Sequence, residues 1–83
     1  MSGQIPEDEL QEALHQVEVE LRRAYEIHGD FQSMHEGYAV LLEEVDELWD
    51  EIKKRGAMRD REQLMNESKQ VAAMGVKFLM FVL

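Results

Sequence analysis

The chain carries three glutamates, Glu44, Glu47 and Glu51, whose types and spacing suit metal binding. At roughly 100° of rotation per helical residue, their side chains fall within about 60° of one another, beside an apolar stripe. Like charges three or four residues apart on a helix repel one another. A solvated acidic face is the common explanation of such a row. The position of these three glutamates at the edge of a predicted core raises an alternative, a hard divalent cation held by carboxylate oxygens.

These glutamates lie in a segment, Ser33 to Lys54, whose pattern predicts one helix. Ser33 and Glu36 form the S-x-x-E pattern of a capping box, in which each side chain accepts a hydrogen bond from a backbone N–H at the helix start. Apolar residues recur at three- and four-residue steps, the period of one helical face, and we expect that face in the core. Its members are Met34, Tyr38, Leu41, Leu42, Val45, Leu48, Trp49 and Ile52.

The run Glu43-Glu44-Val45-Asp46-Glu47 has the form EExxE and resembles the signature of the MazG-like all-α nucleoside triphosphate pyrophosphohydrolases. The resemblance covers roughly residues 20 to 80. In that family the second and third acids of EExxE hold magnesium together with an ExxD pair on the following helix. The resemblance therefore implies Glu44, Glu47 and Glu67 as ligands, with Gln70 standing where the family has Asp.

The resemblance implies a metal-dependent enzyme that converts a nucleoside or deoxynucleoside triphosphate to the monophosphate and pyrophosphate. Mg²⁺ is the expected cofactor, with Mn²⁺ as a second possibility. A spare carboxylate, Glu43 or Glu51, would accept the proton of the attacking water. The Gln70 substitution leaves an alternative open, in which the chain is a helical protein-interaction module with a degenerate metal site.

A cluster of basic residues follows the carboxylate row, and we expect it to bind the substrate's phosphates. Lys54 at a helix C-terminus can simply interact with the helix dipole. That explanation does not extend to Arg55, Arg59 and Arg61, whose guanidinium groups suit phosphate geometry.

Two aromatic residues, Phe31 and Tyr38, are candidates for stacking on the nucleobase. Aromatic side chains at helix junctions more often fill the core. Both roles therefore remain open for these two residues.

Two further helices are expected on either side of this segment. The first runs from Pro6 and Glu7 to about Ile27, since proline and acidic residues suit a helix start. Its heptad-like seam consists of Leu10, Leu14, Val17, Leu21, Ala24 and His28. The third begins near Arg61, after an Asp60 cap. These patterns predict an all-α fold, an antiparallel helical bundle of three main helices.

With 83 residues, the chain is long enough for a single domain, 1–83, in which residues 1–5 form a flexible tail. A core this small is marginal, and the segment from Phe78 to Leu83 is apolar on every side, so we expect a homodimer or homotetramer. A net charge of −9 argues against binding to nucleic acid or to anionic membranes. The absence of cysteine and of a signal-peptide pattern predicts a cytoplasmic protein.

Overall fold

The computed structural model describes residues 3–83, which form three α-helices and one short 3-10 turn. The helices are α1 (Glu7–His28), α2 (Met34–Lys53) and α3 (Arg61–Val82), and the turn η1 (Gly56–Met58) lies between α2 and α3. The described residues contain no strand, so the predicted all-α fold with three main helices is confirmed. Residues 1–2 of the predicted tail lie outside the described residues. None of the helices described is both long enough and apolar enough to cross a membrane.

The predicted caps begin α2 and α3, although one bond of the capping box differs. The Ser33 Oγ accepts a hydrogen bond from the Glu36 N–H at 3.0 Å. The Glu36 Oε1 in turn accepts one from the Gln32 N–H at 2.7 Å, one residue before the donor that the capping box predicts. At the start of α3, Asp60 Oδ1 accepts from the Glu62 N–H at 2.9 Å. These bonds satisfy N–H groups that have no partner inside either helix.

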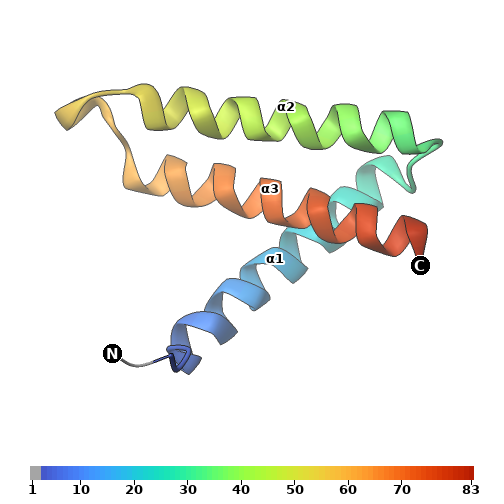
Figure 1. Cartoon of the computed structure of the whole chain (residues 1–83), viewed down its shortest axis with the longest axis horizontal. Helices are drawn as coiled ribbons and strands as arrows, with labels where there is room; N and C mark the ends of the chain where they lie inside the picture. The colour runs from blue at the N-terminus through green and yellow to red at the C-terminus, as the bar shows by residue number, and fades with distance from the viewer. Residues whose placement is uncertain (1–2) are drawn as a thin grey trace.

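The α2 and α3 helices lie side by side and run in opposite directions, whereas α1 crosses α3 at an angle (Figure 1). Close backbone approaches join α2 with α3 and α1 with α3, but none joins α1 with α2. The N-terminal half of α1 diverges from the other two helices (Figure 1). The antiparallel α2–α3 pair therefore positions the carboxylates, and the C-terminal half of α1 closes one end of that pair.

The core lies at this closed end and is small. The Phe31 ring packs against Phe78 and Phe81, with ring centroids 6.3 Å and 6.1 Å apart. Gly37 allows α2 to approach these rings, because a Cβ atom there would lie 2.8 Å from a ring carbon of Phe78. The buried apolar residues are Ala24, Phe31, Ala73 and Met74.

The predicted core face of α2 is wrong for most of its members. Only Leu41 and Leu48 are half-buried against the rest of the fold. The other six form an exposed band, which we call the outer apolar stripe: Met34, Tyr38, Leu42, Val45, Trp49 and Ile52. Their directions lie within about 40° of one line down the helix, well away from the side that faces α3. The apolar positions of α2 thus span an arc too wide for one partner helix to cover.

The predicted seam of α1 is also only partly buried. Val17, Leu21 and Ala24 pack into or against the core. Leu14 and His28 are exposed, because the N-terminal half of α1 diverges from α3 and the helix ends at His28 beside a pocket.

Candidate metal centre

Three carboxylates from two helices meet between α2 and α3. Glu44 and Glu47 lie one turn apart on α2, and Glu67 comes from α3. Each offers one oxygen, and these three oxygens lie within 4.8 Å of one another. They are the three carboxylates that the family resemblance implied as metal ligands, whereas Glu51, the third member of the row that helix spacing predicted, is not in the group. Because α2 and α3 are antiparallel, residues 20 or more positions apart in the chain reach the same place.

The environment of these oxygens differs from that of a solvated acidic surface. Glu44 and Glu67 are half-buried, and Glu47 is exposed. The Oε2 atoms of Glu44 and Glu67 are enclosed and have no hydrogen-bond partner. The other oxygen of Glu67 accepts a hydrogen bond from Gln63 Nε2 at 3.0 Å, which orients the carboxylate. Buried polar atoms are normally paired, so these two oxygens are available to a ligand.

Glu44 has a strongly perturbed acidity. Burial, followed by the charge of Glu47 and a side-chain hydrogen bond to it and then by the charges of Glu67 and Glu43, raises the pKa of Glu44 from 4.5 to about 7. A carboxyl group with this pKa is partly protonated at neutral pH. A cation at the cluster would replace that proton, since ligand carboxylates bind metals in the deprotonated form.

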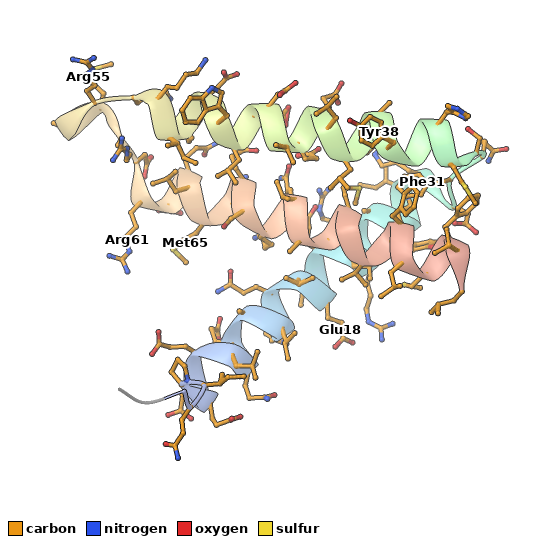
Figure 2. The ribbon with its side chains drawn as sticks, viewed as in Figure 1. Glu18, Phe31, Tyr38, Arg55, Arg61 and Met65 are labelled. Carbon is orange, nitrogen blue, oxygen red and sulfur yellow. The ribbon has the colours of Figure 1, made fainter. Side chains whose placement is uncertain are left out.

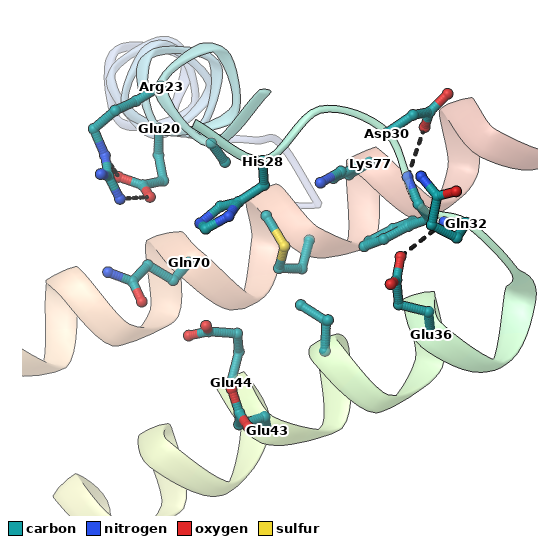
Figure 3. Close-up of a pocket in the computed structure, with 14 residues that line it drawn as sticks. Glu20, Arg23, His28, Asp30, Gln32, Glu36, Glu43, Glu44, Gln70 and Lys77 are labelled. Atoms are coloured by element: carbon teal, nitrogen blue, oxygen red, sulfur yellow. Dashed lines mark hydrogen bonds and ion pairs between the residues drawn. The ribbon is translucent and has the colours of Figure 1, made fainter. Parts of the chain in front are cut away.

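Gln70, the fourth predicted ligand, lies close to this cluster on α3. It lines the same pocket as Glu43 and Glu44, and Figure 3 shows the Gln70 amide and the Glu44 carboxylate facing each other across the space between α3 and α2. An amide oxygen is an accepted ligand of hard cations but brings no charge.

The two predicted catalytic acids, Glu43 and Glu51, have different surroundings. Glu43 is exposed and lines the pocket beside Glu44. Glu51 is only 7% exposed, and its Oε2 forms an ion pair with Lys54 Nζ at 2.9 Å. Its Oε1 is enclosed and has no hydrogen-bond partner. Unlike Glu43 and Glu44, Glu51 does not line the pocket.

The predicted phosphate-binding residues are not gathered at the carboxylates. Lys54 forms an ion pair with Glu51. Arg59 donates a hydrogen bond from Nη2 to the Ile52 carbonyl oxygen, at 2.6 Å, at the end of α2. Arg55 and Arg61 point away from the space between α2 and α3 (Figure 2). Arg61 lines a separate groove between α1 and α3.

The two aromatic candidates also separate. Phe31 is 5% exposed and lines the pocket beside the carboxylates. Tyr38 belongs to the outer apolar stripe and is 62% exposed. Sequence reasoning missed another pocket residue, Lys77, whose ammonium group lies 4.4 Å from the centroid of the Phe31 ring. One signal was available, because Lys77 is the only charged residue after Lys69.

Comparisons with known proteins returned no relatives. The chain matches no protein-family model, no curated protein and no solved structure.

The raised pKa of Glu44 predicts a pH-dependent stability. Between about pH 4.5 and about pH 7, the folded protein keeps a proton on Glu44 that the unfolded chain has already released. The free energy of unfolding therefore falls as the pH rises through this window. In EDTA, we expect the melting temperature of the wild type, relative to that of Glu44→Gln, to fall across this window. Thermal unfolding followed by circular dichroism measures this difference.

Asp46→Asn is the matched control, because Asp46 is an exposed acid of the same helix and its substitution also replaces a carboxyl group with an amide. Its melting temperature should differ from that of the wild type by the same amount at each pH. Parallel pH curves for the wild type and Glu44→Gln would contradict the assignment.

Proposed function

We propose that this chain is a metal-dependent nucleoside triphosphate pyrophosphohydrolase that releases pyrophosphate and leaves the nucleoside monophosphate. The observation that carries the proposal is the meeting of Glu44, Glu47 and Glu67, whose oxygens lie within 4.8 Å of one another. The EExxE run of α2 supports it through its resemblance to the MazG-like enzymes. The EExxE run contains Glu44 and Glu47, and the wider resemblance adds Glu67 on the following helix.

The residues present fit a divalent cation. Three carboxylates supply hard, anionic oxygens, and two of these oxygens are enclosed without a hydrogen-bond partner. No cysteine is available for a thiolate site, so Mg²⁺ is the proposed ion and Mn²⁺ the alternative. Gln70 would add a neutral oxygen or orient a neighbouring water.

A divalent ion held by Glu44, Glu47 and Glu67 would neutralise charge on the triphosphate and would lower the pKa of the attacking water. The chain's own residues do the remaining work. Glu43 lies next to Glu44 in the sequence and lines the same pocket, so we assign it the role of accepting the water's proton. Glu51 is held by Lys54 and is the second candidate. The adjoining pocket, of about 420 Å³, has a size typical of small-molecule sites and would hold the nucleoside.

We further propose that the protein is a homodimer or homotetramer in the cytoplasm. The outer apolar stripe exposes six large apolar residues along one side of α2, among them Trp49, which is 54% exposed. Contiguous apolar surface of this kind typically marks an interaction site. The lack of cysteine suits a reducing compartment.

The reaction is tested by measuring pyrophosphate release from the standard nucleoside triphosphates. Release should require Mg²⁺ or Mn²⁺ and should fall by roughly a hundredfold or more in Glu44→Gln, Glu47→Gln and Glu67→Gln, because even outer-shell partners of a metal contribute 10-fold to 100-fold. Asp46→Asn should keep the wild-type rate, since it removes a charge outside the cluster. Wild-type rates in the three glutamine variants would contradict the site. A wild-type protein that binds no divalent ion and releases no pyrophosphate would favour the interaction-module alternative.

The assembly is tested by sedimentation velocity at tens of micromolar, a typical working concentration. We expect a dimer or tetramer for the wild type and a shift toward monomer for Trp49→Glu, which places a charge inside the outer apolar stripe. Asp50→Lys, at an exposed position next to it, should leave the assembly intact. A well-folded wild-type monomer would contradict this proposal.

A further inference from the structure

Lys77 of α3 is a buried cation for which the fold provides no carboxylate partner. Lys77 is only 3% exposed. Within residues 3–83, the ion pairs involve other cations, and the Lys77 ammonium group instead lies over two aromatic rings, with Nζ 4.4 Å from the Phe31 centroid and 5.1 Å from the Tyr25 centroid. Figure 3 shows the ammonium group directed into the pocket, toward His28.

The aromatic rings offset part of the charge, and the N–H donors of Lys77, which have no acceptor among residues 3–83, face the open pocket. A lysine ammonium has three donors and no acceptor. A ligand that fills the pocket excludes water from the ammonium group and must then supply an acceptor, because a donor left unsatisfied away from water is unfavourable. A ligand with an acceptor oxygen at this place would satisfy the group.

The same pocket connects Lys77 with the candidate metal centre. Glu44 and Gln70 line one part of it, and Lys77 lines another. Gln70 and Lys77 are seven residues apart on α3, which places them on nearly the same face and about 10 Å apart along the axis. A ligand bound by its phosphates at the carboxylates would therefore have to extend along α3 to reach Lys77.

We propose that this pocket binds the nucleobase and that Lys77 selects bases with a keto oxygen on the edge remote from the sugar. These bases are uracil, thymine and guanine. Cytosine and adenine carry an amino group at the corresponding position, and an amine offers donors where the ammonium needs an acceptor. The proposal rests on the proposed function, because the carboxylate cluster determines which end of the nucleotide reaches Lys77.

The charges around the pocket favour a neutral acceptor over a second anionic group. Asp30, Glu36 and Glu43 line the pocket together with Glu44. Arg23, another cation of its lining, is paired with Glu20 at 2.7 Å. An anion near Lys77 would face these carboxylates, whereas a base carbonyl brings an acceptor without a charge.

The test uses uridine and cytidine, which have no phosphate and differ in the keto and amino groups in question. Both are titrated into the wild-type protein in EDTA, and the NMR signal of the Met74 methyl group reports occupancy, since Met74 lines the pocket. We expect uridine to bind roughly tenfold to a hundredfold more tightly than cytidine, as for a hydrogen bond to a charged group. Lys77→Met keeps the apolar stem and should bring the two affinities together.

Lys69→Met is the matched control, because Lys69 lies on the same helix outside this pocket and should keep the preference for uridine. Circular dichroism verifies that each variant is folded. Equal affinity of the wild type for uridine and cytidine would overturn the proposal without any variant. So would an unchanged preference in folded Lys77→Met, or displacement of uridine by inorganic phosphate, which would assign Lys77 to an anion.

This experiment separates the inference from the proposed reaction, because it needs neither metal nor turnover. Asp46→Asn should keep the preference for uridine, since Asp46 is exposed and does not line the pocket. A protein with this preference that releases no pyrophosphate would support the base site and overturn only the reaction. A protein that releases pyrophosphate equally from keto and amino substrates, with or without Lys77, would overturn only the base selection.

Discussion

The close approach of three carboxylates is the constraint that most affects the α2–α3 pair. Packing these helices places Glu44, Glu47 and Glu67 with oxygens within 4.8 Å of one another, and like charges at this distance oppose the packing. A proton offsets part of the repulsion, as the pKa of about 7 for Glu44 indicates. A divalent cation would offset more of it and would also pair the two enclosed oxygens. The same interaction thus relates the stability of the fold to the proposed chemistry.

A second constraint is the small apolar interior. The core consists of a few residues around Phe31, and α1 covers only one end of the α2–α3 pair. The chain consequently leaves the outer apolar stripe in contact with solvent, which is the basis for the proposed self-association. The pocket lies where α1, the α1–α2 connection, α2 and α3 all contribute, so its shape depends on that small core.

The features that depend on local spacing were predictable from the sequence. Helix period and capping residues such as Ser33 and Asp60 predicted α2 and α3, and the EExxE pattern indicated Glu44 and Glu47. The resemblance to a family added Glu67, which the structure brings to the same place. The partner of each apolar face was not predictable, since periodicity identifies a face of a helix without identifying what covers it. This is why the outer apolar stripe was expected in the core.

The surroundings of the basic residues were likewise not accessible from sequence order. Closeness in the chain suggested phosphate binding by Arg59 and Arg61, but the turn directs these side chains to the end of α2 and to a groove beside α1. Lys77 lies on α3, far along the chain from the EExxE run on α2. Only the fold brings it into the pocket that Glu44 lines. Tertiary packing decides such contacts, and a single sequence does not contain them explicitly.

The central claim is that Glu44, Glu47 and Glu67 bind one divalent cation in exchange for the proton on Glu44. Calorimetric titration of the metal-free protein with Mg²⁺ at pH 7, in two buffers of different ionisation enthalpy, counts the protons released on binding. Because the pKa of Glu44 is raised to about 7, the account predicts saturable binding that releases part of a proton per ion at pH 7, and loss of both in Glu44→Gln. Heat that follows ionic strength alone, with no proton released, would contradict it.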